Sequence, residues 1–259
     1  MNDKLRIGSS TFDSRLLHCF GNPSLGFSSP HEIAQVIVSS GTSFLTLYTH
    51  NGIDSYQTID DFAIGYTGTR FGDIKGLIDV CKYKLLVNTN YSHSVSDAVH
   101  KAEVGSRIAG AQTIKLEVLN SSGTRPVNKD VVNAAEILTQ KGYEVYPIID
   151  KYDLWAANAL VEIGCPCIRV LLSDIGSMNG LTEITFIRRL IEEFPDTPII
   201  AEGGISSPQD VFNVISVGAS AVLINASMFY YSDTIQYINA IKSCITAGRS
   251  AYLCRRIDR

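Results

Sequence analysis

A buried strand is predicted by the stretch Thr113-Ile114-Lys115-Leu116-Glu117-Val118-Leu119, which is mostly β-branched and apolar. It nevertheless holds Lys115 and Glu117 two residues apart, and the period of two in a strand places both side chains on one face. Burial pushes the pKa of a lysine down and favours the neutral, nucleophilic amine, whereas a nearby carboxylate pushes that pKa up. The pair suits imine formation with a carbonyl substrate, and it equally suits a structural ion pair inside a sheet or barrel.

Strand-like and helix-like stretches alternate on both sides of this strand. The predicted strands are 15–19, 43–47, 84–88, 113–119, 144–149, 167–172, 198–201 and 221–225. Between and after them, apolar residues recur three and four positions apart over 30–39, 94–108, 129–141, 154–163, 181–194, 208–217 and 234–247. The chain therefore contains close to eight β/α units.

Helix boundaries are marked by proline and glycine. Pro30 and Pro208 each follow serine where a helix should begin, which is where proline is tolerated best. Glycine falls where helices should end and leads into the next strand at Gly41, Gly142, Gly164 and Gly218. This repeated punctuation favours an α/β fold of the (β/α)8 TIM barrel type, with an open doubly wound sheet as the alternative.

A single domain covering residues 1–259 fits the length and composition. The chain is 45% hydrophobic, so it can bury a large core, and no linker or low-complexity segment divides it. One region, 51–75, is irregular and rich in glycine, threonine, aspartate and aromatic residues where the second helix should lie. It is predicted to be either a poorly patterned helix or a loop inserted over the barrel mouth.

Charge and composition exclude several classes of partner. The net charge of −4 offers no basic face for nucleic acid or for an anionic membrane. The start of the chain lacks the apolar core of a signal peptide, and no later run approaches the length of a membrane span, so a cytoplasmic protein is expected. The six cysteines are scattered and predicted to be reduced core residues, and the five histidines show no ligand spacing, so no metal site is expected.

Short turns of small and polar residues follow the seventh and eighth predicted strands, where TIM barrels often hold phosphate. They comprise Glu202-Gly203-Gly204 and Asn225-Ala226-Ser227. Paired glycines let backbone N–H groups approach an anion closely, and the following helix presents its N-terminal dipole. The alternative is a tight turn that needs glycine for its backbone angles, but the recurrence at both loops favours phosphate binding.

Other strand ends add candidate residues to the same mouth. Glu202 would face the cavity that holds Lys115 and could act as a general acid or base. Gly176 and Ser177 follow the sixth strand in a loop that could lie over the substrate. Asn88-Thr89 follows the third strand and would supply neutral hydrogen-bonding groups, although a turn or helix cap explains this pair equally well.

Taken in this order, these motifs resemble the thiazole synthase family of thiamin biosynthesis over nearly the whole chain. The matching stretches are Ile7-Gly8 with Thr11-Phe12-Asp13-Ser14-Arg15-Leu16, Leu85-Leu86-Val87-Asn88-Thr89, Ile114-Lys115-Leu116-Glu117-Val118, Ile175-Gly176-Ser177 with Gly180, Glu202-Gly203-Gly204-Ile205 and Val222-Leu223-Ile224-Asn225. Each is weak alone, but their order and spacing are specific.

The resemblance implies a (β/α)8 barrel in which Lys115 forms an imine with 1-deoxy-D-xylulose 5-phosphate. Glu117 and Glu202 match carboxylates that move protons during the rearrangement of the imine to a ketone. A small ubiquitin-like carrier protein then delivers sulfur from its C-terminal thiocarboxylate, and dehydroglycine completes the thiazole. The family also implies a homo-oligomer, and no cofactor is expected.

Several positions depart from the family pattern. The usual Gly-Thr-Gly-Lys after the first strand is replaced by His18-Cys19-Phe20-Gly21-Asn22-Pro23, and Tyr48-Thr49-His50-Asn51 stands where the family has arginines. Glu202 replaces an aspartate, and Tyr146-Pro147-Ile148 replaces Leu-Pro-Tyr. The lysine and phosphate end is retained, whereas the end for the second substrate has changed.

These departures leave three alternatives beside thiazole phosphate synthesis. A divergent member could keep the imine and sulfur steps on a hexose or other phosphosugar, as a 2-thiosugar phosphate synthase. A non-catalytic paralogue could bind the sulfur carrier as a scaffold or regulator, which the altered loops permit and the retained Lys115, Glu117 and Glu202 argue against. A Schiff-base aldolase of the same fold would bind no sulfur carrier.

Overall fold

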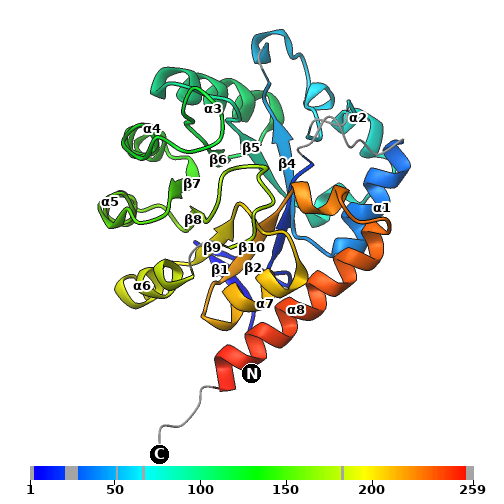
Figure 1. Cartoon of the computed structure of the whole chain (residues 1–259). Helices are drawn as coiled ribbons and strands as arrows, with labels where there is room; N and C mark the ends of the chain where they lie inside the picture. Colours follow the sequence, from blue (N-terminus) through cyan, green and yellow to red (C-terminus); the bar gives the residue numbers. More distant parts are fainter. Residues whose placement is uncertain (1–2, 21–28, 51, 66–67, 182–183, 255–259) are drawn as a thin grey trace, which may run out of the picture.

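The computed structural model is a ring of parallel strands surrounded by helices (Figure 1). It describes residues 3–20, 29–50, 52–65, 68–181 and 184–254. Eight strands form one sheet in the order β3-β10-β9-β8-β7-β6-β5-β4. They are β3 (Leu16–His18), β4 (Phe44–Tyr48), β5 (Lys84–Asn88), β6 (Thr113–Leu116), β7 (Glu144–Asp150), β8 (Ile168–Leu171), β9 (Ile199–Glu202) and β10 (Ala221–Ile224).

Every neighbouring pair in this order is parallel, which confirms the predicted (β/α)8 barrel. The barrel is nearly closed, because no ladder joins β3 to β4 in the part of the chain that the structure describes. Side chains span this seam: Cys19 Sγ lies 3.5 Å from Thr46 Oγ1. Parallel closure brings the carboxyl ends of all eight strands to one mouth, where the sites of such barrels form.

Eight α-helices surround the strands in the described residues. They are α1 (Pro30–Ser40), α2 (Phe71–Ile74), α3 (Val95–Ala109), α4 (Asn128–Gln140), α5 (Leu154–Ile163), α6 (Thr185–Glu193), α7 (Pro208–Ser216) and α8 (Thr234–Cys254). The proline starts are confirmed, because Ser29 and Ser207 cap the helices that begin at Pro30 and Pro208. Residues 182–183 of the predicted helix 181–194 lie outside the described part, and α6 begins only at Thr185.

The core has two layers. The larger lies between the outer faces of the strands and the helices and includes Ile114, Val170 and Leu190. The smaller fills the barrel and includes Phe44 and Tyr146, both fully buried. Side chains that point inward from the strand ends therefore rest on a packed floor and face the mouth.

A β-hairpin that the sequence patterns did not predict covers the start of the barrel. It consists of β1 (Leu5–Ile7) and β2 (Ser10–Phe12), which pair antiparallel. Leu5, Ile7 and Phe12 join the core inside the barrel. Strands of three residues are too short for an alternating pattern to be recognised.

The described part of the irregular region is a compact series of turns, and of the predicted poorly patterned helix only the four residues of α2 are helical. Asn51 and residues 66–67 lie outside the described part. The remainder contains two 3₁₀ turns, η1 (Ile53–Ser55) and η2 (Ile59–Asp61), followed by α2. Phe62, Ile64 and Phe71 are buried, so apolar anchors at irregular spacing hold the segment in place. A further 3₁₀ turn, η3 (Val80–Lys82), leads into β5.

Within the described residues, no helix has both the length and the apolar character needed to cross a membrane. The six cysteines are free, and Cys19, Cys165 and Cys167 are buried as predicted. Cys81 and Cys254 are exposed, so for these two residues the prediction of a core position is wrong.

Candidate active site

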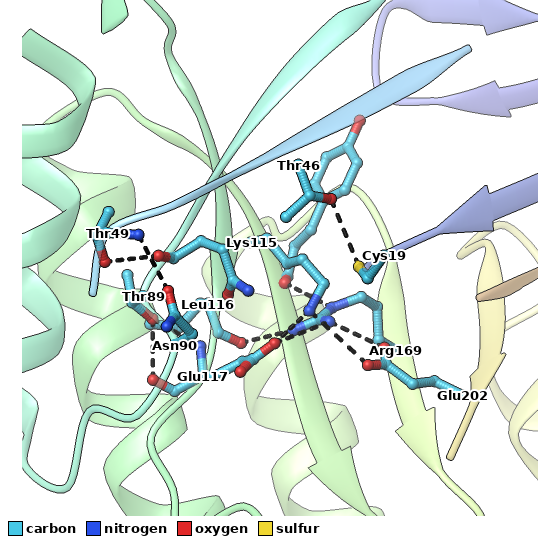
Figure 2. A network of polar contacts seen from close by, with 12 residues as sticks. Cys19, Thr46, Thr49, Thr89, Asn90, Lys115, Leu116, Glu117, Arg169 and Glu202 are labelled. Atoms are coloured by element: carbon cyan, nitrogen blue, oxygen red, sulfur yellow. Dashed lines mark hydrogen bonds and ion pairs between the residues drawn. The ribbon is translucent and has the colours of Figure 1, made fainter. Parts of the chain in front are cut away.

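Four charged side chains meet inside the mouth of the barrel (Figure 2). Lys115 comes from β6, Glu117 follows β6, Arg169 comes from β8 and Glu202 ends β9. The Lys115 ammonium is hydrogen-bonded to Glu117 Oε1 and lies 3.8 Å from Glu202 Oε1. Arg169 Nη1 lies 2.9 Å from Glu202 Oε2 and 3.7 Å from Glu117 Oε1. Two positive and two negative charges thus form one cluster, and no member is more than 8% exposed.

The end of β6 positions Glu117. The strand stops at Leu116, three residues before its predicted end at Leu119. The Thr89 hydroxyl donates to Glu117 O at 2.9 Å and accepts from Glu117 N at 2.8 Å, so a side chain takes over both backbone groups. Although Glu117 lies outside the strand, its carboxylate contacts Lys115 on the face that the period of two predicts.

The pKa of Lys115 differs from the sequence-based hypothesis, which let burial favour the neutral amine. Burial and the Arg169 guanidinium do lower this pKa, but Glu117 and Glu202 outweigh them, so the pKa lies above its ordinary value. Burial raises the pKa of Glu117, but Lys115, Arg169 and a hydrogen bond from Asn88 outweigh it and hold that pKa below its ordinary value. The resting site is therefore ionised, and a proton must leave Lys115 before its amine can attack a carbonyl.

Arg169 is the charged residue that the sequence patterns missed. Its side chain is completely buried, and Nε and Nη2 donate to Tyr146 O at 3.1 Å and to Leu116 O at 2.8 Å. The signal was present, because an arginine inside an apolar strand is as unusual as the lysine that singled out Lys115.

A pocket opens directly above Lys115 and Glu117. Asn88 lies at its wall, with its backbone carbonyl held by the Thr49 hydroxyl at 2.7 Å. The Asn88 amide group donates to Glu117, and its Oδ1 is buried without a hydrogen-bond partner in the described structure. Such an oxygen is ready to accept a hydrogen bond from a bound molecule. The lining is Cys19, Tyr48, Asn88, Asn90, Tyr91, Lys115, Glu117, Leu119, Gly123, Ile175, Glu202, Leu223 and Asn225.

A second pocket adjoins the first and contains the paired glycines. It is lined by Ile175, Gly176, Met178, Glu202, Gly203, Gly204, Ile205, Leu223, Ile224, Asn225 and Ala226. Ile175, Glu202, Leu223 and Asn225 line both pockets, so the two form one continuous mouth. A molecule in this mouth can contact the glycine turn and the Lys115 amine together.

The turn after β9 requires glycine for its own conformation. Gly203 has φ +78°, and a Cβ there would lie 2.3 Å from Leu171 Cδ1. Gly204 has φ +73°, and a Cβ there would lie 2.4 Å from the Ser173 Cβ. Both alternatives from the sequence are therefore compatible, because the tight turn is also a wall of the pocket.

Comparison with known proteins identifies the family. The family model described as thiazole biosynthesis protein ThiG matches residues 6–259. The thiazole synthase of Exiguobacterium sibiricum is 31% identical over 98% of this chain and 93% of its own length. That of Campylobacter jejuni serotype O:6 is 31% identical over 97% of this chain and 90% of its own. This chain belongs to the thiazole synthase family. It is thus a member of an enzyme family of thiamin biosynthesis.

Solved structures agree with the fold of this thiazole synthase family member. The crystal structure of the Amycolatopsis orientalis BexX/CysO complex matches with a TM-score of 0.83 and 26% identity, over 98% of this chain and 97% of that chain. A native KDPGal structure matches with a TM-score of 0.59 at 10% identity, over 96% and 100% of the two chains, and shows the fold alone.

Three of the residues proposed from the sequence as substrate ligands do not line either pocket of this family member. Thr89 is turned to the Glu117 backbone, and Ser227 is buried. The Ser177 hydroxyl lies 3.4 Å from Asn179 N, within its own loop. The N-terminus of α7 is also occupied, because Asp210 Oδ2 accepts from the backbone N–H groups of Ser206 and Ser207. An anion in the second pocket therefore meets the backbone of the turns and not this helix end.

The departures from the family pattern gather around the first pocket. Cys19 and Tyr48 line it beside Lys115. His18 points elsewhere: its Nε2 bonds the Ser40 hydroxyl at 2.9 Å, and burial lowers its pKa to about 4. Residues 21–23 of the altered stretch lie outside the described part. Cys19 and Tyr48 thus shape the end of the mouth farther from the glycine turn, whereas Glu202, which also departs from the pattern, lines both pockets.

Proposed function

We propose that this protein is a sulfur-incorporating synthase that binds a sugar phosphate as an imine on Lys115. The observation that carries the proposal is the buried Lys115 ammonium between two carboxylates, facing a mouth that also contains the glycine turn. Family membership supports the same conclusion. The first candidate substrate is 1-deoxy-D-xylulose 5-phosphate, and thiazole phosphate is the product.

Proton transfer begins the reaction, because Lys115 rests as an ammonium. Its proton passes to a carboxylate, and the freed amine attacks the substrate carbonyl, forming the C–N bond while the carbonyl electron pair moves to oxygen. A proton moves from the new nitrogen to this oxygen to give the carbinolamine. The carboxylic acid then returns its proton to the carbinolamine hydroxyl, which leaves as water, and the protonated imine remains. Glu117 and Glu202 are close enough to Lys115 to exchange protons during the later rearrangement to a ketone.

The phosphate of the substrate is assigned to the second pocket. Gly176, Gly203, Gly204, Asn225 and Ala226 line it, and glycine allows backbone N–H groups to approach an anion closely. Because Glu202 lines both pockets, a molecule held there by its phosphate places its carbonyl end toward Lys115. This arrangement converts the imine step into a reaction between neighbouring groups.

The sulfur donor is proposed to be a small ubiquitin-like carrier with a C-terminal thiocarboxylate. Support comes from family membership and from the BexX protein, which was solved in complex with a second protein, CysO. A binding measurement with purified carrier proteins tests this part separately. Absence of any carrier binding alongside imine formation would favour a Schiff-base aldolase instead.

A second candidate is 2-thiosugar phosphate synthesis on a hexose phosphate. Cys19 and Tyr48, which belong to stretches that depart from the family, line the pocket beside Lys115. A changed wall at the reacting end favours a changed carbon skeleton, while the glycine turn retains the phosphate. The imine and sulfur steps are the same in both candidates.

Borohydride trapping tests the proposal and separates the candidates. The protein is incubated with pentulose and hexose phosphates, reduced, digested and analysed by mass spectrometry. The expected result is a Lys115 peptide carrying the mass of one reduced sugar phosphate, and the mass identifies the sugar. Absence of a Lys115 adduct with both classes of sugar refutes the proposal. A non-catalytic scaffold is distinguished by Lys115→Ala, which leaves the biological activity of a scaffold intact and abolishes that of the enzyme.

A further inference from the structure

We propose that Arg169 is a positioning residue: it holds the Glu202 carboxylate in an ion pair and leaves Glu117 as the carboxylate that takes the proton from Lys115. The inference rests on the proposed imine at Lys115 and goes beyond it, because it assigns different roles to two carboxylates that both neighbour the amine. Arg169 itself lines neither pocket and touches no bound substrate, so it acts only through its neighbours.

Backbone carbonyl groups hold the Arg169 guanidinium in place. Leu116 O and Tyr146 O accept from Nη2 and Nε, so carbonyls on two adjacent strands fix its plane. Its remaining donor, Nη1, is directed at the carboxylates. A guanidinium does not lose its proton in proteins, so this point of the barrel carries a permanent positive charge.

The two carboxylates stand in unequal positions. Glu202 Oε2 accepts from Arg169 at 2.9 Å, and Glu202 Oε1 lies 3.8 Å from the Lys115 ammonium. Glu117 has the opposite preference, because Oε1 is hydrogen-bonded to Lys115 and lies 3.7 Å from Arg169. Proton transfer needs a hydrogen bond along which the proton moves, and Lys115 has one with Glu117.

Charge balance points the same way. Transfer from Lys115 to Glu117 leaves Arg169 and Glu202 paired and creates no isolated buried charge. Protonation of Glu202 would instead leave Arg169 beside a neutral acid at 2.9 Å, with the Glu117 carboxylate at 3.7 Å as its anionic partner. Among the described residues, the thiol of Cys19 interacts with Lys115, Glu117 and Glu202, and the thiol of Cys167 interacts with Arg169. Burial raises the pKa of both thiols, so they stay neutral.

Carboxyl ¹³C NMR of the substrate-free protein, labelled at glutamate, tests the role of Arg169. Glu117→Gln and Glu202→Gln assign the two signals. In Arg169→Met, the Glu202 signal is expected to take up its proton at a pH about one to three units higher than in the unchanged protein. Arg169→Lys keeps the charge and is expected to move it by less than about half a unit. An unchanged Glu202 signal in Arg169→Met overturns the proposal.

The double variant Arg169→Met with Glu202→Gln covers the case in which Arg169→Met does not fold. It removes both partners, leaves no unpaired buried charge and is expected to fold. Its Glu117 signal is expected to titrate within about half a unit of the unchanged protein, because loss of the Arg169 charge, which lowers the Glu117 pKa, is offset by loss of the like charge of Glu202. A Glu117 signal shifted by more than one unit in this variant means that Arg169 acts mainly on Glu117, and the proposal fails.

Trapping rates test the division of roles between the carboxylates. Glu117→Gln is expected to slow formation of the Lys115 adduct by at least about a hundredfold, and Glu202→Gln by no more than about tenfold. Equal reductions of the rate in Glu117→Gln and Glu202→Gln overturn the proposal that the two carboxylates have different roles. The NMR titration contains no sugar, so it gives its answer even if no sugar forms an adduct and the proposed function falls.

Discussion

The barrel contains a lysine–glutamate pair at each end, and the two pairs have different surroundings. At the start of the barrel, Lys84 bonds Glu144, and the hydroxyls of Ser10, Thr113 and Tyr146 complete their contacts. The hairpin β1–β2 packs on this end. At the mouth, Lys115 and Glu117 are joined by two further charges and lie on the wall of an open pocket.

Burial alone does not separate the two pairs by function. The side chains of Lys84 and Glu144 are 20% and 27% exposed, whereas those of Lys115 and Glu117 are only 3% and 9% exposed. The two pairs differ in whether they line a pocket. Lys115 and Glu117 line the first pocket, whereas Lys84 and Glu144 line neither pocket of the mouth. The difference favours the reactive alternative for Lys115–Glu117, as proposed above, whereas Lys84–Glu144 has the form of a structural ion pair.

The largest effect is expected from replacing the two lysines by methionine. Lys115→Met removes the nucleophile and should lower product formation by at least about a thousandfold. Lys84→Met should leave adduct formation within about twofold and cost about 1–2 kcal/mol of unfolding free energy, because Glu144 keeps its hydroxyl partners. Turnover and denaturant unfolding measure both changes. A similar loss of turnover in the two variants would show that Lys115 has no role in the reaction that Lys84 lacks.

A smaller effect is expected when the two glutamates are changed. Glu117→Gln cannot accept the proton of Lys115 and should slow adduct formation by about a hundredfold or more. Glu144→Gln keeps hydrogen-bonding capacity at the other end and should leave the rate unchanged. Stopped-flow trapping of the adduct provides the rates. Equal rates for Glu117→Gln and the unchanged protein would remove Glu117 from the reaction.

The glycine turn should show a still smaller and different effect. Gly203→Ala places a methyl group against Leu171 and Ser173 and should raise the sugar phosphate concentration needed for half-maximal trapping by about tenfold. Gly142→Ala is the matched control, because φ is +86° and no atom lies within 4 Å of its Cβ. Gly142→Ala should lose about 1 kcal/mol of stability from the strained backbone, and Gly203→Ala should lose more, because its Cβ would also lie 2.5 Å from Ser173 O. An unchanged concentration dependence in Gly203→Ala separates the turn from substrate binding.

The smallest change is expected with pH. The pKa of Glu117 lies below its ordinary 4.5 and that of Lys115 above its ordinary 10.5, so Lys115 and Glu117 each keep one protonation state between these values. Trapping with cyanoborohydride should therefore vary less than about twofold from about pH 6 to 9. A lysine with a lowered pKa would instead give a rate that rises with a midpoint near neutrality.

The free energy of unfolding should depend on pH through the same pKa shifts of Glu117 and Lys115. The lowered pKa of Glu117 gives stability that is present above pH 4.5 and is lost as the pH falls through the folded value. The raised pKa of Lys115 gives stability that is present below pH 10.5 and is lost as the pH rises through the folded value. Glu117→Gln should remove the loss of stability at acidic pH. Thermal unfolding measured as a function of pH would show this.

Much of the fold could be predicted from local patterns. Repeated β/α alternation and proline and glycine at helix ends report on short-range structure, and they indicated the barrel and the place of Lys115, Glu117 and Glu202 at its mouth. The irregular region around Phe62 and Phe71 could not be predicted, because its apolar anchors follow no period. The single-domain organisation, the cytoplasmic location and the homo-oligomer stay predictions.

The electrostatics of the site depend on contacts between distant strands. The pKa of Lys115 could not be given the right sign from Glu117 alone, because Glu202 and Arg169 approach it from strands more than fifty residues later in the chain. Arg169 stood in a strand interpreted as apolar, and only closure of the barrel brings it below both carboxylates. Pair distances of this kind have no signature in a single sequence.

The most direct test of Lys115 as the lysine that forms the imine is the site of the reduced sugar adduct in the unchanged protein. After incubation with phosphosugars and borohydride, peptide mapping reports Lys115 and Lys84 in one sample. We expect a sugar phosphate adduct on the Lys115 peptide and none on the Lys84 peptide. An unmodified Lys115 peptide with every sugar, or equal modification of the two lysines, would contradict this expectation.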